Sequence, residues 1–255
     1  LLFEHTSGIE EKVIIEKLDR NCRMNLKELS KILFLSKQSI YNRIRSLENR
    51  EIIKAHISVI DKYKLGYENL YLFLKISGLS LADNQQKQTL IKNIHGVTSV
   101  TNFFGDFDVG ISIYYRCLTE LTSILNKIYR IFGKSIENKE LHFTKRHIIQ
   151  SMVFEDKTPR KTFIKETVQE PSVKLTSQEK EILKKLEFNG RANYVELADE
   201  LKISANTVKY HIKKLEKSGV ILGYKTNLDY TKLGYLWNIC LLETFPGKDI
   251  SPILD

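Results

Sequence analysis

The chain has 255 residues, of which 42% are apolar and 28% charged, and its formal net charge is +9. This length allows about two folded domains with buried cores, and no apolar run is long enough to cross a membrane. Cys22, Cys117 and Cys240 are too far apart for a disulfide framework or a metal site, so we expect thiols in a reducing, cytoplasmic setting. The basic excess favours a polyanionic partner.

The sequence contains a long internal repeat. Residues 23–67 align without a gap with residues 191–235, which lie 168 positions later. The two copies end on the same motif, because Lys64-Leu65-Gly66-Tyr67 returns as Lys232-Leu233-Gly234-Tyr235. A repeat of this length indicates a duplicated structural unit.

The first copy predicts three short helices and a strand. Ser7 and Glu10 are placed to cap a helix that runs to about Asn21, and further helices are expected over 25–33 and 36–49. A tight turn between the last two is typical of a helix-turn-helix. A strand over 52–60 follows as a wing. Arg50-Glu51 stands where the second copy has Ser218-Gly219, so the turn after the third helix must be made by a residue that disfavours positive φ.

The third helix of each copy carries its polar side chains on the face away from its apolar positions. Asn and Gln side chains match the hydrogen-bonding edge of adenine, while Arg and Lys suit guanine or phosphate. The pattern therefore predicts binding to double-stranded DNA, and the alternative is an ordinary solvated helix face. The candidate DNA-binding residues are Lys37, Gln38, Tyr41, Asn42, Arg45, Ala205, Asn206, Lys209, Tyr210 and Lys213.

The middle of the chain alternates between strand and helix patterns. The order β-α-β-β-α-β predicts a ferredoxin-like sandwich, with two helices on one face of a sheet. The other face carries apolar residues, so we expect it to be buried by dimerisation. A last strand is expected over 142–154, where His142 and His147 would point to opposite faces. We therefore expect no metal site and no other cofactor.

Pro159 and Pro171 mark a linker before the second copy. Thr176, Asn193 and Ser204 are expected to cap its three helices, Gly219 to end the third, and residues 220–228 to form a strand pair or wing. Residues 236–244 align with the first strand of the sandwich. We expect the native polypeptide to continue for about 70 to 80 residues and to complete a second sandwich.

These motifs together resemble a known family. A winged helix-turn-helix that ends in Asp-x-x-Lys-Leu-Gly, followed by a sandwich containing Phe104-Gly105-Asp106-Phe107-Asp108, is similar to the Lrp/AsnC family of prokaryotic transcription regulators. In that family the sandwich is called the RAM domain. The resemblance implies DNA binding by the third helix, homo-oligomers through the RAM sheets, and often an amino-acid effector. The implied effector residues are Gly105, Asp106 and Asp108, which also fit a simple hairpin turn.

The expected fold class is α+β, with two winged helix-turn-helix units and one complete RAM-like sandwich. The expected domains are a first DNA-binding domain, a RAM-like domain, a linker, a second DNA-binding domain and the start of a second RAM-like domain, over residues 1–63, 64–154, 155–175, 176–233 and 234–255. Such a chain would be a covalent pseudo-dimer. We therefore expect an asymmetric operator, with half-sites about one turn of DNA apart or a multiple of it.

Two alternatives come from other functional classes. Siroheme decarboxylases resemble this family in fold, and an enzyme of that kind would need basic and imidazole groups, for which the candidates are Arg116, His142, Arg146 and His147. A transcription-apparatus adaptor would use its winged helices to bind protein. We expect a regulator without catalytic residues.

Overall fold

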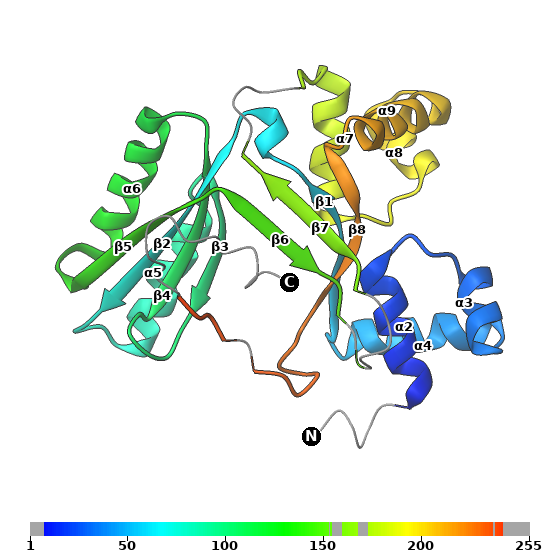
Figure 1. Cartoon of the computed structure of the whole chain (residues 1–255), viewed down its shortest axis with the longest axis horizontal. Helices are drawn as coiled ribbons and strands as arrows, with labels where there is room; N and C mark the ends of the chain where they lie inside the picture. The colour runs from blue at the N-terminus through cyan, green and yellow to red at the C-terminus, as the bar shows by residue number, and fades with distance from the viewer. Residues whose placement is uncertain (1–7, 153, 155–159, 168–172, 237, 242–255) are drawn as a thin grey trace, which may run out of the picture.

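A computed structural model describes residues 8–152, 154, 160–167, 173–236 and 238–241. A sandwich lies on one side of the molecule and two helix-turn-helix units lie on the other, with a pair of long strands between the two units (Figure 1). The fold is α+β, as the sequence predicts. In the described ranges no helix combines the length and apolar character needed to cross a membrane.

The first helix-turn-helix unit forms as predicted, apart from its start. Asn25 and Glu28 make a capping box, and the Ser36 hydroxyl accepts the backbone N–H of Ser39. The first helix begins after Gly8, which offers no side chain to cap it, and the predicted cap Ser7 lies outside the described residues. The helices are α2 (Ile9–Arg20), α3 (Leu26–Leu33) and α4 (Lys37–Asn49), and strand β1 (Ile53–Ile60) follows.

The second unit repeats this order with all three predicted caps in place. Thr176 and Asn193 each form a capping box, and the Ser204 hydroxyl accepts from Thr207. Gly219 follows the third helix with φ of 69°, whereas Glu51 adopts φ of 54° at the same position of the first unit. The elements are α7 (Ser177–Phe188), α8 (Tyr194–Leu201), α9 (Ala205–Lys217) and β8 (Ile221–Leu228).

The two wings pair with each other instead of folding back within their own units. Strands β1 and β8 run antiparallel, and Ile57 lies opposite Lys225, which is its counterpart in the repeat. A local two-fold axis therefore passes through this pair. Two further bonds obey the same symmetry, since the N–H of Asp61 donates to Val220 O at 2.8 Å and that of Asp229 to Ile52 O at 2.9 Å. The sequence predicted the strands but not their partners.

Each unit also completes the core of the other. Ile60 belongs to the core cluster of the second unit, with Leu65 packed against it. Their repeat counterparts Leu228 and Leu233 lie in the core of the first. The backbones approach so closely that a Cβ on Gly190 would lie 2.6 Å from the carbonyl carbon of Ile57. The units are therefore intertwined through buried apolar contacts.

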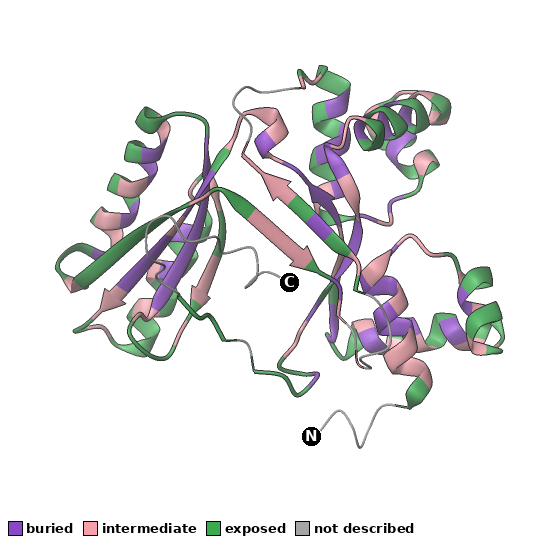
Figure 2. Ribbon diagram, viewed as in Figure 1, coloured by how far each residue is buried: buried purple, intermediate pink, exposed green. Residues whose placement is uncertain are grey.

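The sandwich has one four-stranded sheet, in the order β3 (Val97–Asn102), β4 (Val109–Tyr115), β2 (Glu68–Ile76) and β5 (Ile136–Thr144). Two helices cover one face, and apolar residues of the two central strands are buried beneath them (Figure 2). Gly133–Ser135 and Tyr63–Leu65 are short 3-10 turns, the latter labelled η1. The two helices are α5 (Leu81–Lys92) and α6 (Leu118–Phe132).

The predicted last strand over 142–154 is wrong in its bounds. The chain ends β5 at Thr144 and starts a new strand, β6 (Arg146–Gln150), which leaves the sheet and pairs with β7 (Thr162–Glu166). His142 and His147 therefore belong to different strands. Strand β7 lies within the stretch that the sequence presents as a linker. In the part of 234–244 that the structure describes, 234–236 and 238–241, no strand is formed, and the remaining positions lie outside it.

The sheet face away from the helices carries an aromatic cluster. The ring of Phe73 lies 6.0 Å from Phe103, 5.6 Å from Phe107 and 5.4 Å from His142, between ring centroids. Gly110 makes room for it, because a Cβ there would come within 2.4 Å of Phe103. This face is therefore shaped for aromatic packing, as its apolar pattern suggests.

Candidate nucleic-acid interface

Helix α4 presents all five of its candidate residues to solvent. Its buried side is made by Ile40, Ile44 and Leu47, which fixes the rotation of the helix on its unit. The five exposed side chains are Lys37, Gln38, Tyr41, Asn42 and Arg45. Gln38 Nε2 donates to Asn42 Oδ1 at 3.0 Å, and Arg45 forms an exposed ion pair with Glu48 at 3.1 Å. Both contacts are on the surface and leave the side chains accessible to a ligand.

Helix α9 presents four of its five candidates in the same way. Asn206, Lys209, Tyr210 and Lys213 are exposed, while Val208, Ile212 and Leu215 form the buried side of the helix. Ala205 differs from the sequence expectation, because it is half-buried and packs against the core of its unit. Its methyl group mainly packs against the core at the start of the helix, and little of it is offered to a ligand.

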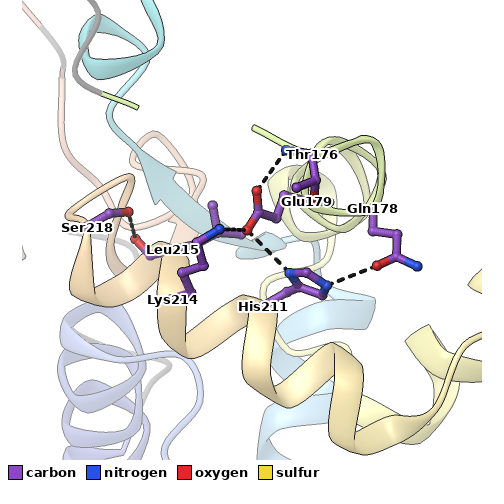
Figure 3. Close-up of polar contacts among 7 residues, drawn as sticks. All are labelled: Thr176, Gln178, Glu179, His211, Lys214, Leu215 and Ser218. Atoms are coloured by element: carbon purple, nitrogen blue, oxygen red, sulfur yellow. Dashed lines mark hydrogen bonds and ion pairs between the residues drawn. The ribbon is translucent and has the colours of Figure 1, made fainter. Parts of the chain in front are cut away.

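A buried carboxylate holds α9 against α7 (Figure 3). The side chain of Glu179 is 1% exposed and lies 2.7 Å from Lys214 Nζ and 3.3 Å from His211 Nδ1. Burial by itself would raise its pKa, but hydrogen bonds from Lys214, the backbone N–H of Thr176 and His211 outweigh burial and lower the pKa of Glu179 to about 2. This cluster ties α9 to α7 and so fixes its orientation. Sequence reasoning identified Glu179 only as part of a cap.

Two lysines that sequence reasoning did not select lie at the C-terminal ends of the third helices. Lys64 Nζ donates to the Ser218 carbonyl at 3.2 Å, and Lys232 Nζ donates to the Arg50 carbonyl at 3.0 Å. Each lysine thus contacts the helix of the opposite unit. The signal that could have identified them is their identity within the repeated Lys-Leu-Gly-Tyr motif.

The turn between the second and third helices adds two exposed side chains that the sequence did not single out. Phe34 and Lys202 occupy the same position of the repeat, and both have φ of 54°. Phe34 is 94% exposed. A surface aromatic ring in one unit and an ammonium group in the other make the two turns chemically different.

The candidate effector turn is already engaged within the sandwich. Asp108 accepts the backbone N–H of Ile76 at 2.7 Å and lies 3.3 Å from Lys75 Nζ, which also donates to Gly105 O at 3.0 Å. Asp106 is exposed, and Gly105 has φ of 142°. Asp108 therefore ties the hairpin to the neighbouring strand, and Asp106 is the carboxylate that remains at the surface of this turn.

Three of the four groups considered for an enzyme are paired locally. Arg116 donates to the Tyr67 hydroxyl at 2.7 Å, His142 lies 2.9 Å from Glu140, and Arg146 lies 2.9 Å from Glu166. His147 is half-buried on β6, where burial first and then Lys165 lower its pKa. Among the described residues no cluster of three His, Cys, Asp or Glu side chains could hold a metal ion.

Comparison with known proteins identifies the family. The family model for winged helix-turn-helix DNA-binding matches residues 11–54 and 175–221, which are the two units described above. The HTH-type transcriptional regulator FL11 of Pyrococcus horikoshii is 31% identical over 127 residues, which is 48% of this chain and 80% of that protein. The chain belongs to the Lrp/AsnC family of DNA-binding transcription regulators. The leucine-responsive regulatory protein of Rhizobium meliloti is 41% identical over 63 residues, 25% of this chain and 40% of that protein.

A solved structure extends the likeness to most of this Lrp/AsnC regulator. The siroheme decarboxylase NirDL superposes with a TM-score of 0.54 over 86% of this chain and 65% of its own, at 14% identity. At that identity the likeness concerns the fold. It agrees with the α+β architecture and carries no information about activity.

Proposed function

We propose that one chain of this regulator binds double-stranded DNA through α4 and α9 together. The observation that carries this proposal is the antiparallel pairing of β1 with β8 about a local two-fold axis. Proteins with paired helix-turn-helix units use such an axis to match two half-sites about 34 Å apart, or a multiple of it. In most dimeric regulators two chains are needed to supply the two helices, whereas here one chain carries both.

The two half-sites are expected to differ in sequence. At matching positions of the repeat, Tyr41 stands against Lys209 and Asn42 against Tyr210. An ammonium group favours guanine or phosphate, and an amide favours adenine. The operator is therefore an asymmetric sequence with a preferred orientation, in contrast to the palindromes that identical subunits select.

Selection from a randomised DNA library tests both statements. The wild-type chain selects duplexes from a pool about 30 base pairs long. Asn42→Ala or Asn206→Ala should each weaken binding by about 1–3 kcal/mol and relax base preference in one half-site. Lys209→Ala should instead reduce the slope of log affinity against log salt by about 0.9 if it contacts a phosphate. Selection of a perfect palindrome, or equal affinity for all duplexes, would count against the proposal.

We also propose that the sandwich carries the regulatory and oligomeric roles. The aromatic cluster around Phe73 supports assembly of chains through this face, and the exposed Asp106 supports recognition of the ammonium group of an amino acid at the hairpin. Such a regulator acts on the chromosome in the cytoplasm. Thermal unfolding with each of the twenty amino acids tests the effector, since a ligand that binds the folded state raises the midpoint.

A catalytic role is the second candidate, and we propose that the chain has none. NirDL shares the fold, which leaves activity open, and the local pairing of Arg116, His142 and Arg146 favours the regulator. Incubation with sirohaem followed by gel filtration separates them. Co-elution of the pigment with the protein and release of carbon dioxide would establish an enzyme and remove this proposal.

A further inference from the structure

The segment Asp61–Tyr67 contacts three parts of the molecule at once. It links β1 of the first unit to β2 of the sandwich and contains the turn η1. Tyr63 in this turn is 1% exposed, its ring lies 6.1 Å from that of Tyr114 in the sheet, and its hydroxyl reaches the Thr144 carbonyl at 3.5 Å. The turn is thus anchored on the sandwich.

The next two residues of the segment contact the opposite helix-turn-helix unit. Leu65 packs against the core of the second unit. Lys64 crosses to the end of α9, where it donates to the carbonyl of the capping residue Ser218. Lys64 Nζ lies close to the backbone of Gly219, where an added Cβ would be 2.4 Å from it. A cation at the C-terminal end of a helix satisfies a free carbonyl and complements the helix dipole.

The second copy of the motif makes the reciprocal contact. Lys232 donates to the carbonyl of Arg50, which caps α4. Leu233, the repeat counterpart of Leu65, is buried in the core of the first unit. The first unit has Glu51 where the second has glycine, and Lys232 pairs with that carboxylate at 2.7 Å. Both recognition helices are therefore held at their C-terminal ends by the other half of the chain.

We propose that Lys64 and Lys232 are positioning residues that couple the repeated segments 61–67 and 229–235 to the recognition helix of the opposite unit. In this arrangement a shift of the sandwich is transmitted through Tyr63 and Lys64 to α9 and changes how α9 binds its half-site. The sandwich therefore acts on the helix of the second unit, although in the sequence it directly follows the first unit, which contains α4. The inference rests on the proposed binding of DNA by α4 and α9. It adds that the segment containing Lys64 controls α9 and that the segment containing Lys232 controls α4.

Hydrogen exchange tests the coupling without DNA. Lys64→Met should speed amide exchange in the last turn of α9, over 214–218, by about two- to fivefold and leave the last turn of α4 unchanged. Lys232→Met should do the reverse. Lys64→Arg keeps the charge and the donor and should behave as wild type. Lys127→Met, on the exposed side of α6, is the control for loss of one positive charge. Faster exchange in α4 with Lys64→Met, or no change in either helix, overturns the inference.

Footprinting on the selected duplex supplies the functional readout. Asn42→Ala and Asn206→Ala first assign one half-site to each helix. Lys64→Met should then lower protection in the half-site assigned to α9, with affinity reduced about two- to fivefold and the salt slope unchanged, because Lys64 bonds a protein carbonyl and no phosphate. Loss in the α4 half-site, or a slope reduced by about 0.9, overturns the inference. If neither alanine variant changes DNA binding while the exchange results hold, the proposed interface is wrong and the coupling between segment and helix stands.

Discussion

The two helix-turn-helix units have the same backbone fold and differ in the side chains that stabilise it. Contacts across the two-fold axis are reciprocal where backbone atoms take part, as with Cys22 N–H donating to Tyr224 O and Gly190 N–H to His56 O. Lys64 and Lys232 also keep matching contacts, whereas other side-chain contacts at matching positions diverge. Buried Lys225 is held by Asp19, while its counterpart Ile57 is apolar.

The symmetric backbone contacts and the asymmetric side-chain contacts meet two different requirements on the chain. The symmetric backbone contacts fix the relative placement of α4 and α9, which the proposed binding of two half-sites requires. The asymmetric side chains can vary where each copy supplies its own matched neighbours, as Asp19 does for Lys225. Substitutions that give one unit the residue of the other therefore test which features are shared.

The largest effect is expected from Lys225→Ile, which copies the residue of the first unit. Asp19 is fully buried, and burial already raises its pKa although Lys225 opposes that rise. Removing the ammonium group leaves a buried carboxylate without its charge partner, which costs about 3–5 kcal/mol of unfolding free energy. Urea denaturation measures the loss. Asp19→Asn combined with Lys225→Ile should recover much of it, because the amide oxygen can still accept the N–H of Met152. An unchanged urea midpoint for the single variant contradicts this account.

The repeat made much of this architecture predictable, since caps and apolar spacing act locally. Asn25, Thr176 and Asn193 cap their helices as their spacing predicts. Strand pairing was harder to predict from the sequence. The alternation of apolar and polar residues identifies a strand and its buried face but not the strand that lies next to it. The same reason explains why strand β7 was missed within the proline-marked stretch. The half-burial of Ala205 was not predicted, because helical spacing does not resolve how far each core extends around the first turn.

A smaller effect, dependent on pH, is expected at His56. Burial first, and then the charge of Arg191, lower the pKa of His56 to about 4, and Glu48 opposes this shift from 3.5 Å. A folded-state pKa below the unfolded value of about 6.5 means that the unfolded chain binds the proton more strongly. Stability is therefore complete above about pH 6.5 and decreases as pH falls toward 4, by about 2 kcal/mol between pH 7 and pH 5.

His56→Tyr removes this dependence and makes the two units alike. Its counterpart Tyr224 donates to Glu216 at 2.6 Å, and burial raises the pKa of Tyr224, so that it stays neutral in this range. Urea denaturation at several pH values should give a flatter profile for the variant than for wild type between pH 7 and pH 5. Parallel profiles would show that His56 is not the group responsible.

The smallest effect is expected from the carboxylates that begin the first helix of each unit. Glu179→Gln removes the charge that pairs with Lys214 and weakens the cap at Thr176, at a cost of about 1 kcal/mol. Glu11, its counterpart, makes a more exposed pair with Arg50 at 3.1 Å, so Glu11→Gln should cost less than half as much. Because the pKa of Glu179 is lowered in the folded state, its contribution is present above about pH 4.5 and is lost as pH falls toward 2. Equal losses for the two variants at neutral pH would mean that burial of Glu179 adds nothing to its pairing, and that α9 is oriented by its apolar side alone.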